Sequence, residues 1–348
     1  RPLPLHGMGN YNMGHPSAKS IYKKINLKRQ IVLLLSAISV LTLLVTDLSV
    51  GSSSLSFFQC LRLLLAGPKT EGTYSLIVWG VRLPMTLTCM GVGGCQTITN
   101  NPLSSPYTLG ISSGASFGAA IAIVTGISIC GFQWIGTALT AFAFALFVTM
   151  TIFVLGRLKR MSAHTLVLIG IVMNFFFSAL QQYLQYSASA EIAQIISNWT
   201  FGNLSRASWT SAGVGLIATA LGMLFFAGIS WKLTAFSAGE ERAKSLGIQV
   251  ERLKMAVFLA SSLLIAAAVG FIGTVGFVGL VAPHCARLLV GEDQRYLMPT
   301  TTMFGMVVML AASTVSKLLS EGSMLPVGII TSIVGVPFLF VLLMREVK

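Results

Sequence analysis

The chain is poor in charge for its length. Asp and Glu number only 10 and Lys and Arg 23 among 348 residues, so 9% of the side chains are charged, against about 25% in an ordinary soluble domain. Hydrophobic residues make up 54% of the sequence. This composition excludes a typical soluble globular protein and indicates a chain that lies largely in a lipid bilayer.

Carboxylates are also missing from the centres of the apolar runs. All ten lie in connecting segments or near the ends of those runs: Asp47, Glu71, Glu191, Glu240, Glu241, Glu251, Glu292, Asp293, Glu321 and Glu346. Carriers coupled to protons or sodium usually hold an ionisable side chain at membrane depth as a relay or ion ligand. The pattern therefore argues against a secondary carrier, which stays as the alternative class.

Three kinds of site motif are absent from the sequence. It has no G-x-x-x-x-G-K-[ST] phosphate loop, so we expect no ATP site in this chain. Its cysteines form no C-x-x-C pair and its four histidines are isolated from one another, so no metal site is predicted. The apolar runs carry no nucleophile–base pair, which disfavours a membrane-embedded enzyme.

The sequence does contain ten apolar runs of about 18 residues or more, each long enough to cross a bilayer. They lie near 31–50, 74–98, 108–130, 132–155, 163–186, 209–230, 255–272, 273–290, 297–318 and 325–344. The runs 255–272 and 273–290 form one almost unbroken apolar stretch that is too long for a single span. Gly270 and Gly273 predict a turn between them. We therefore expect an all-α polytopic membrane protein with one transmembrane domain over 31–348, after a basic tail over 1–30.

The basic residues predict the orientation of these helices, because Lys and Arg favour cytoplasmic loops. If the N-terminus lies inside, the predicted cytoplasmic segments hold 18 of the 23 basic residues. These segments are the tail, 157–160, 231–254, 287–295 and the C-terminus. Both termini are then cytoplasmic. The net charge of +13 is explained by this topology, so no nucleic-acid partner is predicted.

The longest predicted cytoplasmic connection, 231–254, carries eight charged side chains and is interrupted by Gly239 and Gly247. We expect two short surface helices in it. A solvated linker and a docking platform for another protein are both compatible with such a charge run. A second unusual segment contains Gly110, Gly114 and Gly118 at intervals of four residues, which predicts a small-residue stripe for close helix packing.

Five segments in order resemble one family of transport proteins. They are VRLP at 81–84, NPLSSPYTLGISSGASFGA at 101–119, AGEERAKSLGI at 238–248, GFVGLVAPHCARLLVG at 276–291 and LPVGIITSIVGVPF at 325–338. Together they resemble the FecCD or BtuC-like permeases of type II ABC importers, from about residue 31 to the C-terminus. That resemblance implies about ten transmembrane helices and a non-enzymatic transport subunit in the bacterial inner membrane.

The resemblance also implies partners. Two ABC ATPase subunits would bind ATP and Mg, a second permease subunit would complete the pathway, and a periplasmic or lipid-anchored binding protein would deliver the cargo. A homodimer of permeases is the simpler arrangement. The implied cargo is an iron–siderophore, with haem or a corrinoid such as vitamin B12 next and molybdate-type oxyanions as an alternative. No cofactor is expected in this chain itself. Besides the protein partners, the chain is expected to contact membrane lipid.

Residue roles follow from the same resemblance. The implied ATPase-coupling residues are Gly239, Glu240, Arg242, Ala243, Leu246 and Gly247, the implied cytoplasmic gate is Ser162, Ala163 and His164, and the implied binding-protein contacts are Arg82 and Lys317. The spans 163–186 and 325–344 would line the pathway, and 189–197 would form its outer gate. Met85 replaces an expected arginine near Arg82, which weakens the docking prediction.

Overall fold

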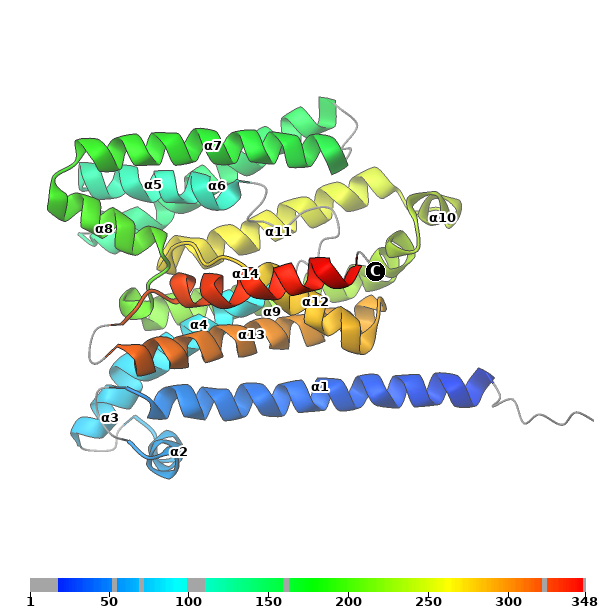
Figure 1. Cartoon of the computed structure of the whole chain (residues 1–348), viewed down its shortest axis with the longest axis horizontal. Helices are drawn as coiled ribbons and strands as arrows, with labels where there is room; N and C mark the ends of the chain where they lie inside the picture. The colour runs from blue at the N-terminus through cyan, green and yellow to red at the C-terminus, as the bar shows by residue number, and fades with distance from the viewer. Residues whose placement is uncertain are drawn as a thin grey trace, which may run out of the picture.

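The chain folds into helices that run mostly along one direction (Figure 1). The structure, a computed structural model, describes residues 18–51, 55–68, 72–98, 110–129, 131–158, 163–320 and 324–346. Within these ranges there is no β-strand, and the one β-bridge joins Ile129 to Phe132. The predicted all-α class is confirmed.

Each of the ten predicted apolar runs contains a helix. In chain order the elements are α1 (Ala18–Ser49), α2 (Phe57–Ala66), α3 (Thr73–Ile77), the π-helix η1 (Val78–Arg82), α4 (Leu83–Thr97), α5 (Ile111–Thr125), α6 (Gln133–Leu158), α7 (Ala163–Ser187), α8 (Ala190–Thr200), the 3-10 helix η2 (Leu204–Arg206), α9 (Trp209–Ser237), α10 (Glu240–Ser245), α11 (Val250–Ile272), α12 (Val278–Val290), α13 (Gln294–Leu319) and α14 (Val327–Glu346).

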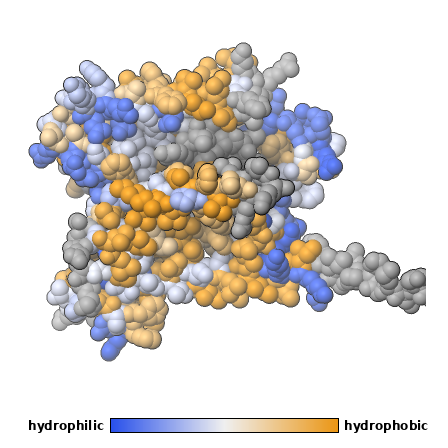
Figure 2. Space-filling view, viewed as in Figure 1, coloured by the Kyte–Doolittle hydropathy of each residue, from blue (hydrophilic) through white to orange (hydrophobic). Residues whose placement is uncertain are grey.

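Seven helical segments of the described residues are long and apolar enough to cross a membrane, and α2, α5, α12 and most of α14 are shorter apolar helices. Figure 2 shows hydrophobic residues across the middle of the molecule and hydrophilic residues towards both ends. The chain is therefore an integral membrane protein. The break in the long run 255–290 lies at residues 273–277, slightly beyond the predicted turn.

One prediction about the longest connection is wrong. Residues 231–254 do not form two separate surface helices, because α9 continues to Ser237 and α11 already begins at Val250. Leu233 and Phe236 pack against the core, which keeps this stretch helical until Ser237. Only α10 is a separate short helix in this segment.

The two largest hydrophobic cores hold most of the helices together. The larger core contains buried residues of α1, α4, α9, α12, α13 and α14, and the smaller core contains those of α5, α6, α7 and α8. Of the helices in the described ranges, only α11 supplies buried side chains to both: Leu253, Val257, Leu264, Ala268 and Ile272 to the larger, and Phe258, Ile265, Ala266 and Val269 to the smaller. Figure 1 shows α11 between the two groups.

Glycines allow the closest helix contacts. A Cβ atom at Gly118 of α5 would lie 2.6 Å from the carbonyl oxygen of Thr140 in α6, and one at Gly114 would also collide with α6. In the larger core, Gly91 of α4 faces the backbone of Gly215 in α9. The predicted small-residue stripe is thus a packing surface, as small residues are in membrane helices generally.

Candidate functional site

The charged segment around α10 lies at the same end of the molecule as the N-terminal end of α1 and the C-terminus (Figure 1). Gly239 precedes α10 with φ of 123°, a conformation that favours glycine, and lets the chain turn after α9. Glu240 and Glu241 occupy the first turn of α10 and Arg242 and Lys244 the last, an order that complements the helix dipole. Gly247 follows α10 before α11 begins.

One ion pair holds α10 against the start of α11, and a second lies within α10. The Lys254 ammonium lies 2.8 Å from Glu240 Oε2, and Lys244 lies 3.4 Å from Glu240 Oε1. The hydrogen bond from Lys254 lowers the pKa of Glu240, and the one to Glu240 raises the pKa of Lys244. The Lys254 ammonium also lies 5.7 Å from the centre of the Phe236 ring. Glu240 therefore links the short helix to α11, and Lys254 in turn contacts α9.

The predicted coupling residues form one contiguous surface with a single inward anchor. Ala243 is completely buried, whereas Leu246 is 62% exposed and Glu240 and Arg242 are exposed. Glu241 is also exposed, with 93% of its side chain accessible. An exposed leucine among charged side chains is a reasonable contact for another protein. We call residues 239–247 the coupling segment.

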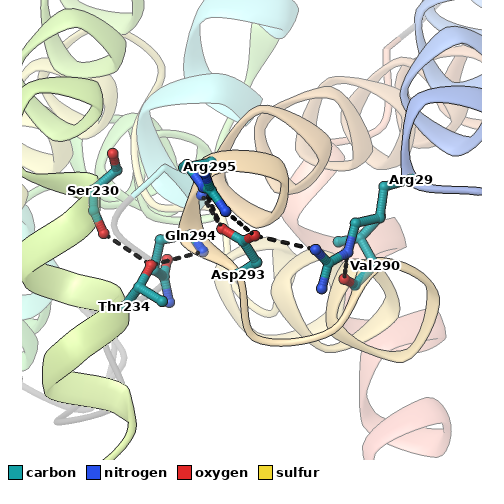
Figure 3. Close-up of polar contacts among 7 residues, drawn as sticks. All are labelled: Arg29, Ser230, Thr234, Val290, Asp293, Gln294 and Arg295. Atoms are coloured by element: carbon teal, nitrogen blue, oxygen red, sulfur yellow. Dashed lines mark hydrogen bonds and ion pairs between the residues drawn. The ribbon is translucent and has the colours of Figure 1, made fainter. Parts of the chain in front are cut away.

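A network around Asp293 joins four helices (Figure 3). Arg29 of α1 donates from Nη1 to Asp293 Oδ2 at 3.1 Å and from Nε to the Val290 carbonyl of α12 at 2.9 Å. Arg295 of α13 donates to both oxygens of Asp293, at 3.0 and 2.9 Å. The hydrogen bonds from Arg295, together with the nearby Arg29, lower the pKa of Asp293.

The same network reaches α9. The backbone N–H of Gln294 donates to Thr234 Oγ1 at 3.2 Å, and Thr234 Oγ1 donates to the Ser230 carbonyl at 2.9 Å (Figure 3). Sequence reasoning missed this network. Its only signal was an acidic residue directly before a predicted helix, which is typical of an N-cap.

At the other end of the molecule, Lys317 of α13 and Asp47 of α1 form a buried ion pair. Lys317 Nζ lies 2.7 Å from Asp47 Oδ2, and the side chains are 4% and 0% exposed. Lys317 also donates to the Asp47 carbonyl at 2.8 Å. Thr86 donates to Oδ2 at 2.6 Å and Thr314 donates to Oδ1 at 3.3 Å, so the carboxylate has three side-chain partners.

Arg82 lies in the same region and is 6% exposed. Its Nη1 donates to the carbonyl oxygens of Leu48 and Ser49 at 2.7 and 3.1 Å, so it binds the C-terminal end of α1. A cation at that position complements the helix dipole. Contact of Arg82 and Lys317 with a binding protein stays a prediction, and it would require both side chains to leave these internal partners.

The predicted cytoplasmic gate falls at the edge of what the structure describes. Ser162 lies outside the described residues, Ala163 begins α7, and His164 follows in its first turn, with the side chains of both also outside them. Among the described residues, no three His, Cys, Asp or Glu side chains are grouped so that they could hold a metal ion. The gate stays a prediction.

These features define a polytopic α-helical membrane protein with a charged, partly exposed segment at one end. The chain belongs to the FecCD transport family, whose sequence profile matches residues 33–345. The family resemblance of the five motifs is thereby confirmed, and the chain is an ABC importer permease.

Individual relatives support this assignment. A protein of Methanocaldococcus jannaschii, whose name assigns it provisionally to the ABC transporter permeases, is 34% identical over 97% of this chain and 99% of its own length. The molybdate import system permease MolB of Haemophilus influenzae is 31% identical over 86% of this chain and 91% of its own. Other relatives are named as permeases for iron chelatin, cobalamin and hemin.

A solved structure has the same fold. It is described as an inward-facing conformation of a transporter assigned to the metal-chelate type of ABC transporter. It superimposes with a TM-score of 0.78 and 28% identity, covering 91% of this chain and 99% of that one.

Proposed function

We propose that this chain forms the transmembrane pathway of an ATP-driven importer for a metal chelate. An iron–siderophore is the first candidate cargo, with haem and corrinoids next. The proposal rests on the family and on relatives named for these compounds. Two copies of the permease, two ATPase subunits and a binding protein would form the complex in the cytoplasmic (inner) membrane of a prokaryote. ATP and Mg would bind only to the ATPases.

The proposed partnership with the ATPase subunits is supported mainly by the exposure and the fixed position of the coupling segment. It presents exposed charges and an exposed leucine, and the ion pair between Glu240 and Lys254 and the buried Ala243 fix its position against the membrane helices. A flexible solvated linker would need neither. The ends of α1 and α14 that lie on this side would then be cytoplasmic, in agreement with the distribution of basic residues.

Charge reversal tests this partnership. We expect Glu240→Arg, and deletion of 239–247, to abolish co-purification of the ATPase subunits. Glu191→Arg is the matched control, because Glu191 is exposed on α8 at the opposite end of the molecule. The Glu240 side chain is 43% exposed, and an arginine there can turn into water, so Glu240→Arg should still yield a folded, monodisperse permease. An ATPase complex that survives both changes to the coupling segment would contradict the proposal.

A molybdate-type oxyanion is the second candidate cargo, because the Haemophilus influenzae relative is named for molybdate import. The ligand carried by the cognate binding protein when it is isolated from cells would separate the two cargo classes. Transport by the purified permease alone, driven by an ion gradient, would instead favour a secondary carrier and contradict both.

A further inference from the structure

The helix α11 connects the coupling segment to the opposite end of the molecule. It begins at Val250, shortly after Gly247, and ends at Ile272 beside the end of α8 (Figure 1). Its side chains are buried in both hydrophobic cores, as described above. A helix that is packed on both sides in this way moves as a unit with its neighbours, because close-packed interiors transmit displacement.

At its far end, α11 is bonded directly to the end of α8. The N–H of Asn203 donates to the carbonyl of Ile272 at 2.8 Å, although the two residues are far apart in sequence. The hydroxyl of Thr274 donates to the carbonyl of Thr200 at 2.5 Å. The last turn of α8 is therefore held by the break between α11 and α12.

The same turn is held from a second side by α14. The N–H of Val327 donates to the carbonyl of Gly202 at 2.9 Å, and that of Gly328 donates to the carbonyl of Phe201 at 3.1 Å. Three segments thus meet: 200–203, 272–274 and 327–328. We call this meeting point the junction. Most of its bonds are between backbone groups, which side-chain motion cannot break.

Glycines leave no free space in the junction. A Cβ atom at Gly273 or Gly328 would lie much closer than 3.0 Å to a carbonyl oxygen of the 199–201 stretch, and one at Gly202 would lie 2.6 Å from the carbonyl oxygen of Thr274. Gly202 and Gly273 also have φ of 71° and 84°, where other residues are strained. Each segment therefore approaches the next at backbone contact.

The same C-terminal turn of α8 also has side-chain bonds to α7. Gln181 Nε2 donates to Thr200 Oγ1 at 3.0 Å, and Gln185 Nε2 donates to Ser197 Oγ at 2.7 Å. A displacement that reaches the junction therefore reaches α7 and α8 together, as well as α14. These are the helices that the family resemblance places along the pathway and at its outer gate.

We propose that α11 transmits movement of the coupling segment to α8 and α14 through the junction, with Gly202 and Thr274 as positioning residues. The inference rests on the proposed ATPase partnership and deepens it. It assigns the communication between the two membrane faces to one helix and one set of backbone bonds. Without the junction, α8 would be connected to α11 only through side-chain packing in the smaller core.

The substitution Thr274→Val tests the junction, because it removes the hydroxyl donor and keeps the shape of the side chain. We expect the amount of substrate transported per ATP hydrolysed to fall about twofold to tenfold in the reconstituted complex, the scale of one part-buried hydrogen bond. Thr274→Ser keeps the donor and should restore the ratio. The matched control is Thr151→Val, because the Thr151 hydroxyl is exposed and bonds only to Phe147 of its own helix.

The outcomes separate the two proposals. If the wild-type complex does not transport the cargo, the proposed function is wrong. If it does, and Thr274→Val keeps the wild-type ratio, the junction inference is wrong.

Hydrogen exchange of the wild-type permease gives a second test that needs no variant. Binding of ATPase subunits loaded with a non-hydrolysable ATP analogue should change exchange at the amides of 240–247 and also at Asn203 and Val327, which are junction donors. A change confined to 240–247 would contradict the inference. Changes at both ends, with the amides of α2, which packs on α1, unaffected, would support it.

Discussion

Replacing Lys317 by methionine would leave the carboxylate of Asp47 buried without its countercharge. At the observed separation of 2.7 Å, the attraction between the two charges is about 6 kcal/mol for an effective dielectric constant of about 20. Desolvation of the two ions opposes most of this gain, so the intact pair adds little net stability. Removing one partner keeps the desolvation cost of the other. We therefore expect Lys317→Met to lower the free energy of unfolding by about 3–5 kcal/mol.

The loss should be largely recovered by neutralising the carboxylate. In Asp47→Asn with Lys317→Met, the amide oxygen still accepts from Thr86, and no unpaired charge remains. Chemical unfolding of the purified permease in detergent would measure all three proteins. Lys244→Met is the matched control, because Lys244 is 52% exposed in its side chain and its ion pairs are in water. We expect it to have wild-type stability.

Two results would refute this reasoning. The first is a Lys317→Met protein as stable as the wild type, which would mean that water or another cation reaches Asp47. The second is a double variant at least as unstable as the single one, which would mean that Lys317 stabilises the fold through packing rather than through its charge.

Two further predictions concern Asp293 and the α5–α6 contact. The lowered pKa of Asp293 means that its ion pairs stabilise the fold above its ordinary pKa of about 3.9 and are lost as the pH falls through the lower folded value. Asp293→Asn should thus be less stable than wild type at pH 7. In acid unfolding, the stability difference between the two proteins should shrink below about pH 4, and a difference that stays constant would contradict this. Gly118→Ala should lose about 1–3 kcal/mol through overpacking. Gly228→Ala, with no atom near the added carbon, should lose nothing, and equal thermal stability of the two variants would refute the packing argument.

Hydropathy located a helix within every predicted apolar run, although α5 and α12 are shorter than the runs 108–130 and 273–290 that contain them. The exception, 231–254, shows the limit of local reasoning. Its charges indicated separate surface helices, but Leu233 and Phe236 extend α9 by packing on the core. Periodicity in a charged segment does not reveal which of its few apolar residues will find a buried partner.

The polar contacts could not be predicted from sequence, because their partners are distant in the chain. Arg29 and Asp293 are 264 positions apart, and Lys317 and Asp47 are 270. The positions of Asp47 and Lys317 near the ends of apolar runs were correctly predicted, but their pairing was not. The junction was even harder to predict, because it consists mainly of backbone hydrogen bonds. Only glycines mark it in the sequence.

The sharing of α11 between two cores has a consequence for biogenesis. The helices α5 to α8 are synthesised before α11, and their core remains incomplete until Phe258, Ile265, Ala266 and Val269 are added. During insertion this half of the protein must therefore expose to lipid, or to the insertion machinery, the surface that α11 later covers. A ribosome-bound chain that ends before residue 250 would lack a fully packed smaller core, however many helices it has already inserted.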